Sequence, residues 1–402
     1  MPAPEVVIVG AARTPIGRYG GAFRTMHPAE LGAVATRAAL ERARIDPASV
    51  DDILIGHARQ AGSGPNPARQ VGRRAGVPDG VPAQTINKAC ASGMQAVASG
   101  AQSILVGESE IVVAGGIESM SRMPYLIDPE DARWGHRMGH FTLVDAMYRD
   151  GFTCSLSGMV MGETAELLAR HSGITREESD QYAVETQGRA ARAASEGWFA
   201  DEIAPVTITD AKGRETRVAA DEHPRPDTTI ESLRKLAPVF GEVDGYPGII
   251  TAGTSSGITD GGAALVLTTH TRAQALGVRP LARVLGWASA GVDPRIMGIG
   301  PVPAMRKLFA KTGLTAADFD LVELNEAFAA QVLAVLREEP LDRDRLNVNG
   351  GAIALGHPIG CSGARILVTL LYEMRRRHAR RGLATLCVSG GMGMAMAIER
   401  CE

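Results

Sequence analysis

The stretch Ala83-Gln-Thr-Ile-Asn-Lys-Ala-Cys90-Ala-Ser-Gly93 places one cysteine between a strand and a helix. Residues 83–86 can form a short strand, and apolar residues after Gly93 recur at helical spacing until Gly107 offers a C-cap. Cys90 is therefore predicted at a helix N-terminus, where unpaired N–H groups and the helix dipole lower a thiol pKa and favour a nucleophile. A lone free cysteine more often serves as a small buried hydrophobic residue, so the prediction that Cys90 is a nucleophile needs support from other residues.

The length and net charge of the chain limit the number of compact units and the kinds of partner that can be expected. Its 402 residues exceed the roughly 250 to 300 at which one core stops growing, so two or more compact units are expected. A net charge of −3 without a dense basic run argues against nucleic acid and membrane surfaces as partners.

Five scattered cysteines without Cys-x-x-Cys spacing disfavour a disulfide framework and a structural zinc site, and indicate a reducing compartment. Residues 1–10 lack the features of a signal peptide, and no apolar run is long enough for a membrane span. A soluble cytoplasmic protein is the expectation.

The chain contains a duplication. A helix from about Pro28 to Arg44 and a strand from Asp52 to Gly56 recur as a helix from Val302 to Thr312 and a strand from Asp320 to Leu324. The unit around Cys90 is echoed as well, by a strand, a glycine-rich turn with a histidine, and a helix from Ala364 to Met374. Alternating strands and helices in two similar halves predict parallel sheets covered on both faces.

Between the halves, residues 121–250 are richer in Arg, His, Met, Asp and Pro and have less regular patterning, which predicts an inserted domain. One helix is expected from Gly162 to His171. A second is expected from Arg176 to Glu196, with Thr175 as N-cap and Glu178 completing a capping box.

Four motifs carry residues suited to chemistry, and all lie at carboxyl ends of predicted strands or on adjoining loops. They are Asn87-Lys-Ala-Cys-Ala-Ser-Gly93, Asn325-Glu-Ala-Phe328, Gly356-His-Pro-Ile-Gly360 and Cys387-Val-Ser-Gly-Gly-Met-Gly393. His357 could act as a base beside Cys90, and the Asn325 amide could hold a water or an oxyanion. Taken singly, His357 and Cys387 could each have a purely structural role. Their shared position at the ends of predicted strands favours a common active site.

These four ordered motifs resemble the thiolase family, and the resemblance extends from Val6 to Glu399. It implies an α/β thiolase fold, in which two similar βαβ-rich halves form a layered α-β-α-β-α core with an inserted loop domain. The corresponding units are an N-terminal half (residues 1–121 with 252–277), an inserted CoA-binding loop domain (122–251) and a C-terminal half (278–402).

The resemblance implies acyl transfer from 3-ketoacyl-CoA to CoA, or the reverse Claisen condensation. Cys90 would be the acylated nucleophile, His357 its base, and Cys387 a second acid/base that moves a proton at the α-carbon. Asn325 would hold a water that polarises a thioester oxygen together with His357. Backbone N–H groups of Cys90 and Ser389 would form the oxyanion hole, although glycine is the family's usual residue at position 389.

The resemblance also implies CoA contacts. Arg225 would meet the nucleotide phosphates, Ser232 and Ser256 would make polar contacts along the ligand, and Phe240 would meet the acyl end. CoA is a substrate, so no cofactor and no metal are expected. A homodimer or homotetramer is expected, because residues 121–140 resemble the family's tetramerisation loop.

One departure bears on the substrate. Biosynthetic acetoacetyl-specific members place a histidine before Met-Gly-x-Thr-Ala-Glu, whereas here Val160 precedes Met161-Gly-Glu-Thr-Ala-Glu166. Valine cannot hydrogen-bond a thioester or keto oxygen, which favours degradation of fatty acids by β-oxidation, or a broad substrate range. Two alternatives remain open: a ketoacyl-synthase-like condensing enzyme, which would place histidine or asparagine where Cys387 stands, and an inactive thiolase-like lipid carrier.

Overall fold

The computed structural model describes residues 4–401. The helices are α1 (Pro28–Ala43), α2 (Pro67–Ala75), α3 (Ser92–Leu105), α4 (Met161–His171), α5 (Arg176–Ser195), α6 (Ile230–Arg234), α7 (His270–Leu276), α8 (Pro301–Thr312), α9 (Ala329–Glu338), α10 (Ala352–Leu355) and α11 (Ile359–Arg377). The strands are β1 (Val6–Arg13), β2 (Gly17–Arg18), β3 (Asp52–His57), β4 (Ala83–Ile86), β5 (Ile111–Ser119), β6 (Tyr125–Leu126), β7 (Val144–Asp145), β8 (Val206–Thr209), β9 (Glu215–Val218), β10 (Glu242–Val243), β11 (Tyr246–Pro247), β12 (Thr259–Thr269), β13 (Ala282–Gly291), β14 (Leu321–Leu324), β15 (Arg381–Val388) and β16 (Met392–Arg400).

The long strands form one hydrogen-bonded path in the order β14-β15-β16-β13-β1-β12-β5-β3-β4, with β2 attached to β12. The two halves of this path meet between β1 and β13, where only Val7–Arg283 and Ile8–Ala282 pair. Parallel pairing occurs at the outer parts, in β3 with β4 and β5, and in β14 with β15. The central pairs are antiparallel, so the prediction of purely parallel sheets is wrong. A tight turn joins β15 to β16, and strands joined this way must run in opposite directions.

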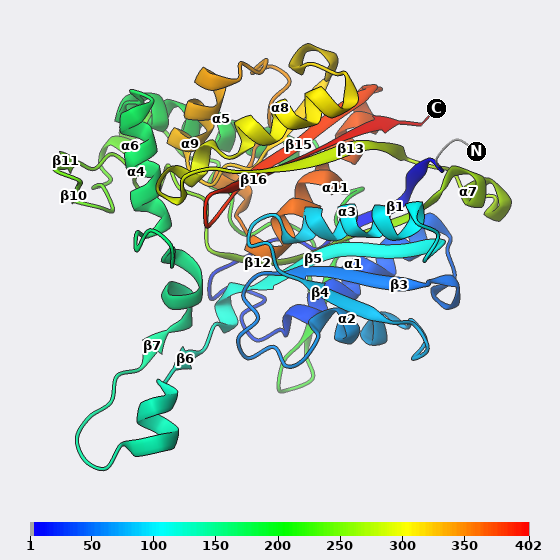
Figure 1. The fold of residues 1–402 in the computed structure, drawn as a ribbon, viewed down its shortest axis with the longest axis horizontal. Helices are drawn as coiled ribbons and strands as arrows, with labels where there is room; N and C mark the ends of the chain where they lie inside the picture. Colours follow the sequence, from blue (N-terminus) through cyan, green and yellow to red (C-terminus); the bar gives the residue numbers. More distant parts are fainter. Residues whose placement is uncertain (1–3, 402) are drawn as a thin grey trace.

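The predicted α-β-α-β-α layering is confirmed (Figure 1). Helices α3 and α11 lie between the halves, where α11 contacts β5 and β12 on one side and β14 and β15 on the other. Helices α1 and α2 cover the outer face of the N-terminal half, and α8 covers the outer face of the C-terminal half. Each half therefore buries both faces of its strands, as their nearly continuous apolar sequences require.

The central helices α3 and α11 approach each other through small residues near their N-termini. A Cβ added to Gly93 of α3 would lie 2.7 Å from the backbone nitrogen of Ala364, and one added to Gly116 of the neighbouring strand β5 would lie 2.3 Å from the Gly360 oxygen of α11. Real Cβ atoms do not approach backbone that closely, so glycine is required for this contact. The contact sets the N-terminal ends of both helices side by side.

Residues 120–258 leave the sheet after β5 and return at β12. Helix α5 begins as expected: Thr175 accepts a hydrogen bond from Glu178 N, and Glu178 accepts one from Thr175 N at 2.7 Å. Figure 1 shows β6 and β7 at the base of an arm that projects from the body. Across residues 4–401, no helix is both long and apolar enough to cross a membrane.

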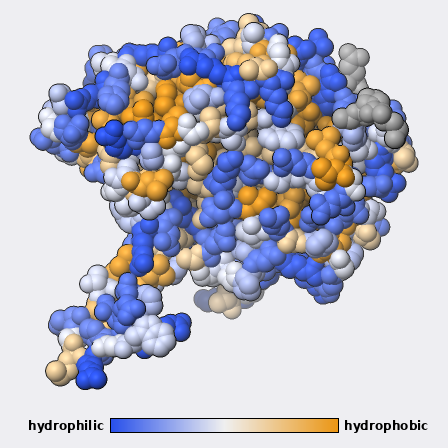
Figure 2. All heavy atoms as spheres, in the orientation of Figure 1, coloured by the Kyte–Doolittle hydropathy of each residue, from blue (hydrophilic) through white to orange (hydrophobic). Residues whose placement is uncertain are grey.

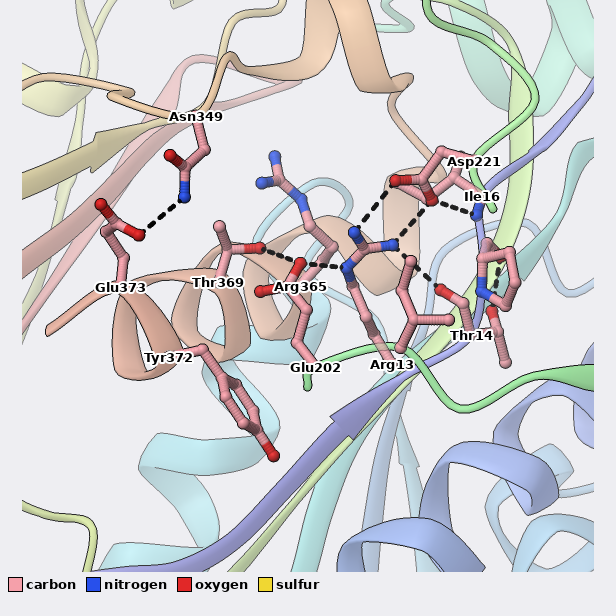
Figure 3. Close-up of polar contacts among 12 residues, drawn as sticks. Arg13, Thr14, Ile16, Glu202, Asp221, Asn349, Arg365, Thr369, Tyr372 and Glu373 are labelled. Atoms are coloured by element: carbon pink, nitrogen blue, oxygen red, sulfur yellow. Dashed lines mark hydrogen bonds and ion pairs between the residues drawn. The ribbon is translucent and has the colours of Figure 1, made fainter. Parts of the chain in front are cut away.

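A buried ionic cluster ties this inserted segment to β1 (Figure 3). Arg13 is fully buried and donates through Nε to Glu202 at 2.6 Å. Its two terminal nitrogens donate to the carboxylate of Asp221 at 2.7 and 3.0 Å. The fork geometry satisfies both carboxylates at once, so Arg13 fixes two loops of the insertion against the end of β1.

Candidate active site

Cys90 lies on a sharp turn between β4 and α3, two residues before the helix begins. Ala89 has φ +46°, a left-handed conformation that is strained for a residue with a Cβ. Ser92 holds this turn, because its hydroxyl donates to Ala89 O at 2.6 Å and accepts from Lys88 N at 2.8 Å. The turn presents the Cys90 sulfur at the N-terminal end of α3.

The predicted lowering of the Cys90 pKa is wrong. Burial of the sulfur raises the pKa of Cys90, and this outweighs the opposing effects of the backbone N–H groups of Ser389 and of Cys90 itself and of the Arg59 charge. Burial disfavours a thiolate more than a single helix end favours it. The resting residue is therefore a thiol that needs a base at the moment of attack.

His357 is buried just before α11 and is suited to be that base. Its Nδ1 lies 2.5 Å from Ser362 Oγ. Ser362 donates its single hydroxyl hydrogen to Pro358 O at 3.0 Å, so it accepts from His357 Nδ1–H, which leaves a lone pair on Nε2. Burial, reinforced by the charges of Arg365 and Arg59, lowers the pKa of His357 to about 3, so the ring is neutral near pH 7.

Cys387 ends the buried part of β15 and lies close to Cys90. Burial raises the pKa of Cys387 far above its usual value, and the charge of a Cys90 thiolate raises it further. Ser389, two residues on, directs its backbone N–H toward the Cys90 sulfur. Positive φ angles fall instead on Gly390 (85°) and Gly391 (82°), and Ser389 is not among the described non-glycine residues with positive φ. Serine therefore fits this position without left-handed strain.

Asn325 follows β14, and its backbone N–H donates to Thr385 O at 3.0 Å, beside the strand that carries Cys387. Its side chain is 1 % exposed, and neither amide atom has a hydrogen-bond partner within residues 4–401. Buried amides are normally hydrogen-bonded, so Asn325 is available to a water or a ligand in the site.

The next residue, Glu326, has a different role. Its buried carboxylate accepts hydrogen bonds from Tyr182, Thr186, Asn347 and Ile353 at 2.8 to 3.1 Å. This network ties the loop after β14 to α5 and α10, and it holds Asn325 in place.

The four residues expected to contact CoA lie in three places. Arg225 and Ser232 line a common cavity of about 310 Å³. The Ser232 hydroxyl is already engaged with Thr229 O, at 2.8 Å, in the cap of α6. Ser256 N donates to Ala327 O at 3.0 Å, which places Ser256 beside the Asn325 loop. Phe240 does not line the cavity.

Phe240 instead packs over Gly162 at the start of α4, where a Cβ on Gly162 would lie 2.2 Å from the ring. Val160 caps this helix and donates from its N–H to Glu163 Oε2 at 2.6 Å. The next side chain, Met161, packs against a small cluster that contains Cys387 and Met297. The wall beside Cys387 is therefore apolar.

Further polar residues, not predicted from the sequence, support these groups. Ser362 lies five residues after His357, two residues beyond the Gly356–Gly360 motif, and that proximity was its only signal. His57 is the last residue of β3 and Glu118 the next-to-last of the adjacent β5, with His57 Nε2 3.0 Å from Glu118 Oε1. Glu118 Oε2 accepts from Gly360 N at 2.9 Å, which anchors the first turn of α11.

Known proteins of one family match this chain along nearly its whole length. Family models described as "Thiolase, N-terminal domain" and "Thiolase, C-terminal domain" match residues 6–271 and 278–400. An acetyl-CoA acetyltransferase from Rhizobium meliloti is 48% identical over 400 residues, covering 100% of both chains. The crystal structure of the Bacillus anthracis acetyl-CoA acetyltransferase has a TM-score of 0.95 at 45% identity and 99% coverage of both chains. Human mitochondrial 3-ketoacyl-CoA thiolase in complex with CoA has a TM-score of 0.93 at 42% identity, covering 99% of this chain and 98% of the other.

Proposed function

This chain belongs to the thiolase family and is an acyltransferase, and from that premise we propose that it acts through an acyl thioester on Cys90. In one direction it cleaves a 3-ketoacyl-CoA to acetyl-CoA and a shortened acyl-CoA, and in the other it performs the Claisen condensation. The observation that carries this proposal is a set of four groups at the ends of α3, α11, β14 and β15. They are the half-buried thiol of Cys90, the buried thiol of Cys387, the neutral imidazole of His357 and the buried amide of Asn325, which has no partner within residues 4–401.

Acylation starts when His357 Nε2 takes the thiol proton of Cys90 and the sulfur attacks the C3 carbonyl carbon of the substrate. The carbonyl oxygen becomes an alkoxide, which accepts hydrogen bonds from the backbone N–H groups of Cys90 and Ser389. The C2–C3 bond then breaks, and its electron pair moves to C2. Protonated His357 and a water on Asn325 stabilise the resulting enolate oxygen. Cys387 donates a proton to C2, which releases acetyl-CoA.

The second half-reaction returns the protons. The Cys387 thiolate takes the thiol proton of an incoming CoA, and the CoA sulfur attacks the acyl group on Cys90. The sulfur of Cys90 leaves with the electron pair of the broken thioester bond and recovers its proton from His357. A raised Cys387 pKa suits this role, because its proton must be exchanged with a carbon acid and a thiol, both weak acids.

Mass measurement after incubation with acetyl-CoA tests the proposal. The wild type should gain one acetyl group, and Cys90→Ala should gain none. Cys387→Ala should still be acetylated, while condensation and thiolysis fall by roughly 10²- to 10⁴-fold, the usual contribution of a positioned acid/base. Equal loss of acetylation and turnover in Cys387→Ala would contradict the assigned role, and wild-type acetylation of Cys90→Ala would remove the central claim.

We place the enzyme on the degradative, broad-range side of the family. Met161 gives the region beside Cys387 an apolar wall, and the preceding Val160 offers no side-chain donor for a short keto group. A series of 3-ketoacyl-CoA substrates should therefore show equal or better kcat/KM for chains longer than acetoacetyl-CoA. A sharp preference for acetoacetyl-CoA would contradict this assignment.

We also propose assembly into a homodimer or homotetramer through the arm. Figure 2 shows the arm standing clear of the body. Trp134 and Met138 near its tip are 74 % and 92 % exposed, and exposed apolar residues of this size favour association. Sedimentation should give a species larger than the monomer at micromolar concentration, and Trp134→Asp with Met138→Asp should reduce its size. A monomeric wild type would refute the proposal.

A further inference from the structure

A second, cationic cavity lies where helices α1 and α11 end, on the side of the molecule where β1 begins and β16 ends (Figure 1). Its volume is about 500 Å³, within the range of small-molecule sites. Among residues 4–401, no Asp or Glu lines the cavity, and five arginines do: Arg42, Arg44, Arg279, Arg375 and Arg400.

These arginines have little acidic compensation in the described part of the chain: Asp201 lines an adjoining cavity together with Arg42 and Arg375, without an ion pair to either. Within residues 4–401, none of the five makes an ion pair, although nearby Arg283, Arg376 and Arg380 all do. The two that make hydrogen bonds do so with neutral groups. Arg42 donates to three backbone carbonyls and the Tyr372 hydroxyl, and Arg400 donates to Ala379 O at 3.1 Å. The cavity therefore concentrates positive charge that an anion would stabilise.

Helix-dipole compensation explains only part of this cluster. Arg42 lies in the last turn of α1 and Arg375 in the last turn of α11, where cations are commonly placed. Arg279 precedes β13 and Arg400 ends β16, so both come from strand ends, although Arg400 also donates to Ala379 O just beyond the end of α11. Segments distant in sequence thus contribute arginines to one concave space, as an anion site requires.

The lining also specifies the kind of anion. Guanidinium groups bind phosphate oxygens in pairs, and several around one cavity suit a chain of phosphates. Val9, Leu281 and Leu371 add an apolar surface, which fits an organic substituent. We propose that this cavity binds an organic di- or triphosphate, with its phosphates on the arginines and its organic part on the apolar surface.

This site is separate from the active site. His357 immediately precedes α11, and the cavity lies at the other end of that 19-residue helix. At about 1.5 Å per residue the two ends are roughly 28 Å apart. Substitutions in the cavity can therefore be tested without altering the active site, and the result is independent of the proposed catalytic roles.

The test is calorimetric titration of the full-length protein with ATP and with inorganic tripolyphosphate in the absence of CoA, because CoA is itself an organic diphosphate and would compete for the cavity. Arg279→Ala/Arg375→Ala removes two arginines that make no side-chain hydrogen bond or ion pair within residues 4–401. Arg24→Ala/Arg217→Ala removes the same charge from exposed positions elsewhere. Both ligands should bind the wild type at one site, and the cavity double variant should bind them on the order of 100-fold more weakly, since each charged hydrogen bond contributes about tenfold or more.

ATP should bind more tightly than tripolyphosphate because of the apolar surface. Binding of ATP no tighter than tripolyphosphate would overturn the organic part of the proposal and leave an inorganic polyphosphate site. Equal weakening in the control pair, or no saturable binding in the wild type, would overturn the site itself. Normal acetylation of Cys90 in the cavity variant verifies that it is folded.

Discussion

Replacing Ser362 by alanine should test whether this hydroxyl holds His357 in the tautomer that can act as a base. In the wild type the Ser362 oxygen accepts from His357 Nδ1–H at 2.5 Å and donates to Pro358 O, which fixes the tautomer with a lone pair on Nε2. Only that tautomer can take a proton from Cys90 through Nε2. Without the hydroxyl, the buried Nδ1–H loses its acceptor, and the tautomer with hydrogen on Nε2 becomes competitive.

The magnitude follows from the cost of that lost bond. Leaving a buried donor unsatisfied costs about 1–3 kcal/mol, which shifts the tautomer equilibrium by about 5- to 150-fold. We therefore expect the rate of Cys90 acetylation to fall by about 10- to 100-fold in Ser362→Ala. The folded pKa of His357, about 3, is set first by burial and then by two arginines, which the substitution leaves in place. The rate should thus show no His357 titration between pH 5 and 8 in either protein.

Rapid-quench measurement of acetyl transfer from acetyl-CoA provides the assay. Ser362→Thr keeps a hydroxyl and should recover part of the rate. Ser103→Ala removes another buried serine, whose hydroxyl donates to Ser109 at 2.9 Å, and should leave acetylation unchanged. Wild-type acetylation in Ser362→Ala, or an equal loss in Ser103→Ala, would refute the tautomer argument.

Two further substitutions test the framework of the site. Arg13→Met should lower the free energy of unfolding by about 3–5 kcal/mol at pH 8, because it leaves buried carboxylates without their cation. Burial already raises the pKa of Glu202, and loss of the Arg13 charge raises it further, so folded protein binds a proton there. Urea unfolding should therefore show a smaller loss at pH 5, and an equal loss at both pH values would contradict this. Gly93→Ala should slow acetylation by roughly 10²-fold per ångström of displacement, because its Cβ would meet Ala364 N at 2.7 Å. Gly188→Ala, whose Cβ meets nothing within 4 Å, is the control, and similar rates in both would count against the contact.

The sequence predicted the elements well where local chemistry decides them. Helix α5 starts at Arg176 because Thr175 and Glu178 form a capping box, and that signal is complete within four residues. The four motifs were recognisable for a similar reason, since each lies within seven consecutive residues. The direction of β12 and β16 was not predictable in this way, because strand alternation with helices does not reveal which strands pair across a long insertion.

The other features that the sequence did not predict depend on contacts between residues far apart in the chain. The pKa of Cys90 was predicted from its helix end, but the two halves close over the sulfur and reverse the direction of the shift. The cavity arginines gave no signal, because Arg42, Arg279, Arg375 and Arg400 become neighbours only when the sheet joins β1 to β13 and β16.

The opposite pKa shifts of Cys90 and His357 have one cause and one consequence. Burial raises the pKa of the thiol and lowers that of the imidazole, so both favour the neutral forms of the pair. A resting thiolate–imidazolium ion pair is thereby disfavoured, which also limits oxidation of Cys90 between turnovers. In the proposed reaction the negative charge passes from sulfur to the substrate oxygen as the bond forms. It is then met by the N–H groups of Cys90 and Ser389, which are fixed before substrate arrives. The site therefore stabilises charge at the oxygen, where it develops, more than at the sulfur, where it would exist without substrate.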